Sequence, residues 1–125
     1  MKTKDFNVLT LAYIGDAIYE VFIRKNLIEK GIVKVKNLQK EAVEYVSARA
    51  QAKFLKEMLD INFFSEEELE VIYRARNNKG KSHPKNTDIL TYKHATALEA
   101  IIGYFYLDNN ENRLHDVMNF ILEKK

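Results

Sequence analysis

Apolar residues recur at helical spacing along most of this chain. Between residues 35 and 59 they return to one face of a helix, at Leu38, Ala42, Val43, Val46, Ala50, Phe54 and Leu55. No stretch shows the alternation expected of a half-buried strand, and the sequence contains no Asn-Gly or Asp-Gly hairpin turn. The pattern therefore predicts an all-α fold.

Capping and helix-breaking residues divide this pattern into separate helices. The first is predicted from about Asp5 to Glu29, ending at Gly31, with Asn7 and Thr10 as candidate caps. The next covers Val35 to Leu59, and the pattern allows a bend near Ser47. Ser65 and Glu68 form a capping box that opens a third helix, which ends near Asn77. The last two are predicted at Ile89 to Leu107 and Glu111 to Glu123, and a loop over residues 77–88 precedes them.

The composition is that of an ordinary soluble globular domain. The chain has 125 residues, 46% of them hydrophobic and 30% charged, which suits a single domain over residues 1–125. The absence of cysteine excludes a disulfide framework and a thiolate metal site. No apolar run approaches the ~18 residues of a membrane span, and MKTKDFNV lacks the apolar core of a signal peptide. We therefore expect a cytoplasmic protein without a membrane partner.

Positive charge is concentrated between Arg74 and Lys93. The net charge is only +2, but this segment contains six basic residues and a single acid, Asp88. Such a basic segment on a mildly acidic body favours an anionic partner, above all nucleic acid. The alternative is that these lysines only solvate a loop. The candidate RNA-binding residues are Arg74, Arg76, Lys79, Lys81, His83 and Lys85.

Two acids interrupt otherwise apolar helical runs. Asp16 lies in LAYIGDAIYE and Glu99 in ALEAIIGYFYL, and each has a glycine nearby, Gly15 and Gly103. A glycine inside a helix costs about 1 kcal/mol relative to alanine. Together with alanines at 12, 95 and 100, these glycines would let two helices approach closely, so the simplest arrangement crosses the helices with both carboxylates facing each other. The expected buried face of the first helix consists of Tyr13, Ile14, Ala17, Ile18 and Val21.

Two facing carboxylates need a cation between them. A hard divalent ion such as Mg²⁺, with oxygen ligands and bound water, fits this requirement. The alternative is that each acid pairs with a lysine or arginine, or lies at the edge of the apolar face in contact with solvent. Glu20, one turn after Asp16, is either a further acid of the same site or a solvated surface residue.

The segments around both acids resemble the acidic motifs of ribonuclease III catalytic domains. LAYIGDAIYE is similar to the family's L-E-F-L-G-D-A core, and TALEAIIGYFYLD to its D-x-x-E-A-x-x-G-x-x-x-x-D motif. More specifically, YIGDAIYE, RARN and HATALEAIIGY resemble the patterns Y-x-G-D-A-x-Y-E, R-x-R-N and H-x-T/S-A-x-E-A-x-I-G-Y of the short bacterial Mini-ribonuclease III branch. The resemblance extends over essentially the whole chain and implies a ribonuclease III catalytic-domain-like helical bundle.

The resemblance also implies an activity. It makes Asp16 and Glu99 the catalytic carboxylates and the ligands of Mg²⁺, with Mn²⁺ as a substitute, in an endoribonuclease of double-stranded RNA. The implied substrate is precursor 23S ribosomal RNA, and whether a ribosomal protein assists is left open. The implied assembly is a homodimer, with Tyr13 and Ile14 at the interface unless they are plain core residues.

The chain also departs from the family pattern. Ala12 and Thr96 replace two further family acids, which predicts weaker Mg²⁺ binding and leaves one or two ions per site open. The chain ends where the family's separate RNA-binding domain would begin, so the basic segment is expected to hold the duplex. Because two of the four family acids are absent, a second interpretation is a non-catalytic double-stranded-RNA-binding or ribosome-associated module. A third interpretation is a helical protein-interaction adaptor. Retention of Asp16 and Glu99 favours the enzyme.

Overall fold

The computed structural model describes residues 2–79 and 88–123, and within these ranges every regular element is helical. A 3-10 turn, η1 (Thr3–Asp5), precedes the helices α1 (Val8–Glu29), α2 (Val35–Val46), α3 (Ala48–Asp60), α4 (Glu66–Arg76), α5 (Ile89–Leu107) and α6 (Glu111–Glu123). The predicted all-α fold is confirmed. Among the described helices, none is both long and apolar enough to cross a membrane.

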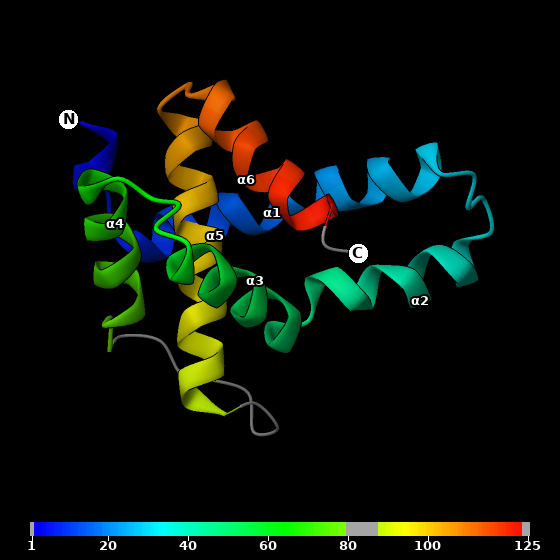
Figure 1. The fold of residues 1–125 in the computed structure, drawn as a ribbon, viewed down its shortest axis with the longest axis horizontal. Coiled ribbons are helices and arrows are strands. Elements are labelled where there is room, and N and C mark those ends of the chain that lie inside the picture. Colours follow the sequence, from blue (N-terminus) through cyan, green and yellow to red (C-terminus); the bar gives the residue numbers. More distant parts are fainter. Residues whose placement is uncertain (1, 80–87, 124–125) are drawn as a thin grey trace.

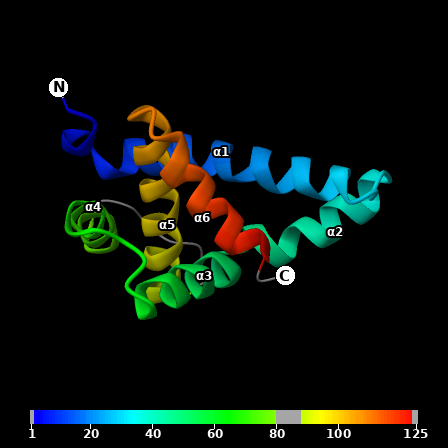
Figure 2. The same ribbon diagram turned by 45° about the horizontal axis from the view of Figure 1, so that its top comes forward.

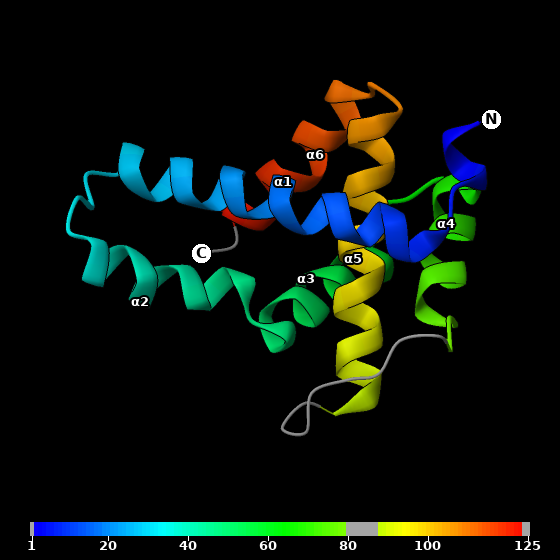
Figure 3. The ribbon, with the colours of Figure 1, turned by 180° about the vertical axis from the view of Figure 1, so that it is seen from behind.

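Helix α5 is the centre of the fold (Figure 1). Helix α1 crosses it on one side, seen from the front in Figure 3, and α3, α4 and α6 also pack against it. Between His94 and Phe105 every residue of α5 is buried except Glu99, which is half-buried. A helix that is apolar on all sides is stable only when other elements surround it. Within residues 94–105, Glu99 is therefore the position at which α5 reaches the surface.

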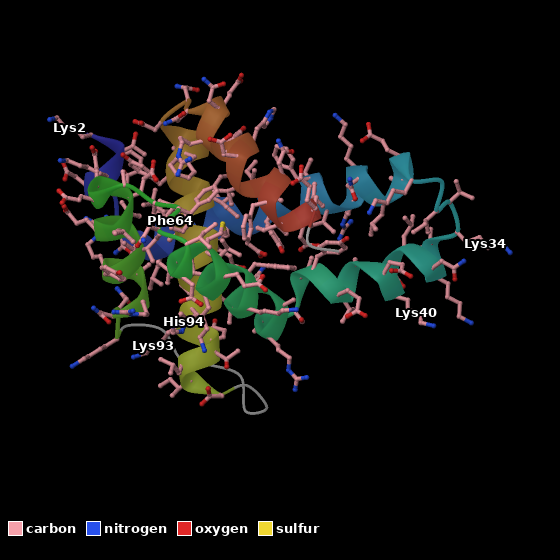
Figure 4. All side chains as sticks on the ribbon, in the orientation of Figure 1. Lys2, Lys34, Lys40, Phe64, Lys93 and His94 are labelled. Atoms are coloured by element: carbon pink, nitrogen blue, oxygen red, sulfur yellow. The ribbon has the colours of Figure 1, made fainter. Side chains whose placement is uncertain are left out.

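Helices α1 and α2 form a hairpin that extends away from α5 (Figures 1 and 2). The turn between them includes Gly31, whose φ of +95° is one that glycine adopts without strain. Figure 4 places Lys34 at the tip of this hairpin and Lys93 and His94 on the first half of α5. The tip of the hairpin therefore lies far from the end of α4 and the start of α5 (Figures 1 and 4).

The capping signals in the sequence mark real helix ends. Asn7 caps α1 by accepting a hydrogen bond from the Leu9 amide, and the capping box between Ser65 and Glu68 is present at the start of α4. The helix predicted over Val35 to Leu59 is interrupted at Ser47, whose ψ of 152° is extended. Ser47 ends α2 and caps α3, because its hydroxyl accepts from the Ala50 amide at 3.2 Å.

The predicted buried face of α1 was wrong. Tyr13 is 82% exposed, Val21 60%, and Ala17 is exposed as well, whereas Ile14 and Ile18 are half-buried. The face that packs against the core consists of Val8, Leu11, Ala12, Gly15, Tyr19, Ile23 and Leu27. Apolar residues cover almost the whole circumference of α1, so their periodicity could not identify the inner face. The face with Gly15 is inside because only a residue without a side chain permits the close approach to α5 described below.

Arg113 of α6 ties that helix to the start of α4. Its Nε donates to Glu68 Oε2 at 3.1 Å, and its Nη2 donates to Glu68 Oε1 at 2.9 Å and to the Phe63 carbonyl at 3.0 Å. The guanidinium also lies 4.7 Å from the centre of the Phe63 ring. Since the Glu68 side chain is only 11% exposed, its charge depends on Arg113 for compensation.

We expect Arg113→Ala to lower the free energy of unfolding by about 2–3 kcal/mol, because it leaves the Glu68 carboxylate and the Phe63 carbonyl without their partner. Urea unfolding followed by circular dichroism measures this loss. Arg24→Ala is the matched control, since Arg24 pairs with Glu20 at 3.1 Å on the surface. It should cost less than about 0.5 kcal/mol, and an equal loss in both variants would contradict a special role for Arg113.

Candidate active site

The two helices that carry the candidate acids touch backbone to backbone. A Cβ atom on Gly15 would overlap the carbonyl oxygen of Glu99 and lie 2.8 Å from the Gly103 nitrogen. A Cβ on Gly103 would overlap the carbonyl oxygen of Leu11. The close glycine-mediated crossing predicted from the sequence is therefore confirmed. Asp16 follows Gly15 directly, so both acids belong to backbone segments in van der Waals contact.

The two carboxylates differ in their surroundings. Asp16 is exposed and Glu99 is half-buried, so the expectation of an acid against a buried face holds for Glu99 and not for Asp16. At 100° per residue, Asp16 lies on α1 between the buried face and the exposed row with Tyr13 and Ala17. No lysine or arginine of the described residues forms an ion pair with Asp16. Glu20 pairs with Arg24, which favours the interpretation of Glu20 as a solvated surface residue.

Neither position of the missing family acids can supply a ligand. Ala12 is 2% exposed and Thr96 is 5% exposed, and both belong to the packed interior of the crossing. Within residues 2–79 and 88–123, no group of three or more histidine, cysteine, aspartate or glutamate side chains could hold a metal ion. The candidate site therefore offers two carboxylates, Asp16 and Glu99.

Tyr19 is a neighbour of this crossing that the sequence analysis missed. It lies one turn after Gly15 on the same face of α1, it is fully buried, and its hydroxyl donates to the Tyr45 carbonyl at 2.6 Å. Burial above all, followed by the Tyr45 phenol and the negative charge of Glu99, raises the pKa of Tyr19. The phenol is thus a neutral hydrogen-bond donor close to Glu99. Only its place in the YIGDAIYE motif could have drawn attention to it.

The predicted RNA-binding residues divide into three groups. Lys81, His83 and Lys85 lie outside the described residues. Lys79 is exposed, and Arg76 is half-buried with its guanidinium 4.6 Å from the centre of the Tyr73 ring. Arg74 is exposed and keeps its charge, but its guanidinium is also bound to the N-terminal segment, since its Nη2 donates to the Lys4 carbonyl at 2.6 Å and to the Phe6 carbonyl at 3.1 Å. Among the described candidates, Lys79 is the one whose charge is most available to a phosphate.

The two described histidines have local structural roles. His94 is buried, and its Nδ1 is hydrogen-bonded to the Leu90 carbonyl at 2.8 Å. His115 is exposed on α6, where its ring meets the Phe22 ring edge-on at 5.5 Å between centroids. Neither belongs to the crossing of α1 and α5. A histidine-based nucleophilic site is therefore not formed by the described residues.

Exposed apolar residues recur along the outer side of α1, which also carries the exposed Thr10 and Arg24. The apolar ones are Tyr13, Ala17, Val21 and Ile28, all exposed, and the half-buried Ile14 and Ile18 flank them. These positions lie within one side of the helix at 100° per residue. We call this set the α1 outer face. Because the exposed fraction of Tyr13 is 82%, the alternative that Tyr13 is a plain core residue is wrong.

Comparison with known proteins gives one consistent result. The model of the Ribonuclease III domain matches residues 9–110. The chain is 48% identical to Mini-ribonuclease 3 of Brevibacillus brevis over 90% of this chain and 82% of that protein, and 43% identical to Mini-ribonuclease 3 of Enterococcus faecalis over 97% and 92%. It also superimposes on the crystal structure of protein FN1578 from Fusobacterium nucleatum with a TM-score of 0.85, at 36% identity and with 96% and 94% of the two chains covered. This chain therefore belongs to the ribonuclease III family and is an endoribonuclease.

Proposed function

We propose that this protein hydrolyses phosphodiester bonds in double-stranded RNA, with Asp16 and Glu99 as the catalytic carboxylates that hold Mg²⁺. The observation that carries the proposal is the crossing at Gly15, which joins the backbone of the Asp16 segment to that of Glu99. The donor set fits a hard divalent ion, because carboxylate oxygens are the ligands that Mg²⁺ prefers and two of them leave positions for water and phosphate. Mn²⁺ would serve in its place.

We propose different roles for the two carboxylates, because Asp16 is exposed and Glu99 is half-buried. Exposed Asp16 would meet the RNA phosphate from solvent, and half-buried Glu99 would fix the ion against the body of the domain. When bound, Mg²⁺ would lower the pKa of water and offset charge on the scissile phosphate and the leaving oxygen. Since Ala12 and Thr96 contribute no carboxylate, we propose weaker Mg²⁺ binding than a four-acid site would give.

The direct test is incubation with a duplex RNA with and without Mg²⁺, followed by mapping of the new ends. We expect staggered cuts that require the ion, and precursor 23S ribosomal RNA is the natural substrate that we propose, in the cytoplasm. Burial of Ala12 and Thr96 at the positions of two family acids favours one competing function, a non-catalytic duplex-binding or ribosome-associated module. A protein that binds duplex RNA but is inert at every Mg²⁺ and Mn²⁺ concentration would support that alternative.

We further propose that Lys79 contacts RNA phosphates together with Arg76 and the basic residues Lys81, His83 and Lys85. Duplex RNA is recognised mainly through its shape and phosphates, so this contact should be electrostatic. Lys79→Ala should weaken duplex binding similarly for all sequences and reduce the slope of log K against log salt by about 1. Fluorescence anisotropy across a salt titration measures both effects. Lys30→Ala, an exposed lysine at the far end of α1, should leave the slope unchanged, and an equal change in both variants would exclude a local contact.

We also propose that two copies of the chain pair through the α1 outer face, so that two sites face the two strands of one duplex. An exposed row of apolar residues marks a protein interface more often than chance, and two-fold pairing is the commonest assembly. Sedimentation equilibrium should give twice the chain mass of 14.6 kDa. Tyr13→Asp should shift the protein to the single-chain mass, whereas Ile61→Asp, at a site 59% exposed beyond α3, should not. A wild type that is monomeric at all concentrations would contradict this assembly.

A further inference from the structure

The break between α2 and α3 leaves a backbone carbonyl without its helical partner. In a continuous helix the Tyr45 carbonyl would accept from the amide four residues later. The extended ψ of 152° at Ser47 ends α2 at Val46, so the carbonyls of the last turn need other donors. Val43 keeps its regular donor, the Ser47 amide four residues later, whereas Tyr45 accepts from the Tyr19 hydroxyl at 2.6 Å. This bond is long-range in sequence, and it joins α1 to the junction of α2 and α3.

The same tyrosine lies beside the candidate site. Gly15 and Tyr19 are one turn apart on the face of α1 that packs on α5, and the side chain of a helical residue leans toward the preceding turn. Gly15 contacts the Glu99 backbone, so Tyr19 covers the region next to Glu99. The effect of the Glu99 charge on the Tyr19 phenol agrees with this placement. One fully buried side chain therefore connects the Glu99 side of the crossing with the point where α3 begins.

We propose that Tyr19 is a positioning residue for the hydrolysis: by donating to the Tyr45 carbonyl, its hydroxyl fixes the last turn of α2, where the chain enters α3, relative to Glu99. This inference rests on the proposed function. Tyr19 cannot touch RNA because it is 0% exposed, and its role is to hold the geometry of the carboxylate side of the site. Small displacements of catalytic groups are costly, since about 1 Å can reduce a rate by about a hundredfold.

The test is Tyr19→Phe, which keeps the ring in the core and removes only the donor. We expect kcat on a duplex RNA to fall about tenfold or more, the KM for that RNA to stay within about twofold, and the dissociation constant of Mn²⁺, measured by electron paramagnetic resonance, to rise about threefold or more. Replacing Tyr19 with 4-aminophenylalanine, which also donates to a carbonyl, should restore all three values.

Tyr104→Phe is the matched control. It also removes a hydroxyl from a buried tyrosine that joins two helices, since Tyr104 donates to Glu67 at 3.1 Å, but it acts between α5 and α4. Its kcat and Mn²⁺ affinity should equal those of the wild type. If Tyr19→Phe behaves in the same way as Tyr104→Phe, the inference is wrong.

Two further outcomes are distinguishable. If Tyr19→Phe folds poorly, the 4-aminophenylalanine variant decides, because a folded but slow enzyme would show that donation to Tyr45 is not the role of Tyr19. A wild type that neither binds Mn²⁺ nor cuts RNA would refute the proposed function itself. An active wild type with an unaffected Tyr19→Phe would refute only the positioning role.

Discussion

Replacing Asp16 with asparagine should lower kcat on duplex RNA by about a thousandfold, while the fold and the affinity for RNA change little. The substitution keeps the shape of the side chain and removes its charge. Since Asp16 is exposed and forms no ion pair with the described residues, its loss should leave stability within about 0.5 kcal/mol. Single-turnover cleavage at saturating Mg²⁺ measures the loss of rate. Duplex binding measured under conditions without cleavage shows whether the affinity for RNA is unchanged.

Glu20→Gln is the control for that experiment. Glu20 lies one turn after Asp16 on the same helix and carries the same charge, but it pairs with Arg24. Its loss should change kcat by less than about twofold, because a surface ion pair contributes little. Equal losses in both variants would indicate that the general negative charge of α1 matters, and full activity of Asp16→Asn would remove Asp16 from the mechanism.

Gly15→Ala should lower the free energy of unfolding by about 3 kcal/mol or more, although alanine is the better helix former by about 1 kcal/mol. The added methyl group would overlap the Glu99 carbonyl oxygen and lie 2.7 Å from its carbonyl carbon, and both are backbone atoms that cannot rotate away. Helices α1 and α5 would have to separate. Urea unfolding should show the loss, and cleavage should fall with it because the two acids move apart.

Two further glycine variants serve as comparisons for Gly15→Ala: Gly103→Ala, at the same helix crossing, and Gly31→Ala, outside it. A methyl group on Gly103 would overlap the Leu11 carbonyl oxygen, so its cost should be similar. A methyl group on Gly31 would meet no atom within 4 Å, and only its φ of +95° is unfavourable, which should cost about 1 kcal/mol. If all three variants lose the same stability, the cause is backbone conformation and not the crossing.

Local signals in the sequence predicted most helix ends and the crossing. Ser65 and Glu68 satisfy each other's backbone groups within one turn, so the signal for the start of α4 is contained in adjacent residues of the sequence. Gly15 and Gly103 indicated a close contact because glycine inside a helix has a cost that packing must offset. The interpretation of Asp16 and Glu99 as a pair followed from that contact together with the family motifs.

Features that depend on tertiary contacts could not be predicted in the same way. Helix α1 is apolar on nearly all sides, and only its packing on α5 decides that Tyr13 faces outward and Tyr19 inward. The sequence allowed a bend at Ser47, but only the fold shows that the Tyr45 carbonyl left over at this break accepts a hydrogen bond from Tyr19, far away in sequence. Arg74 looked like one more cation of a basic segment, and only the fold shows that it holds the N-terminal backbone.

A Mn²⁺ titration followed by electron paramagnetic resonance, on the wild type, Asp16→Asn, Glu99→Gln and the double variant, tests most directly whether one ion joins these two residues. If both carboxylates hold the same ion, each single variant should weaken binding by about tenfold or more, and the double variant should lose much less than the product of the two single losses. Wild-type affinity in either single variant, or losses that simply multiply, would contradict a shared ion at the crossing of α1 and α5.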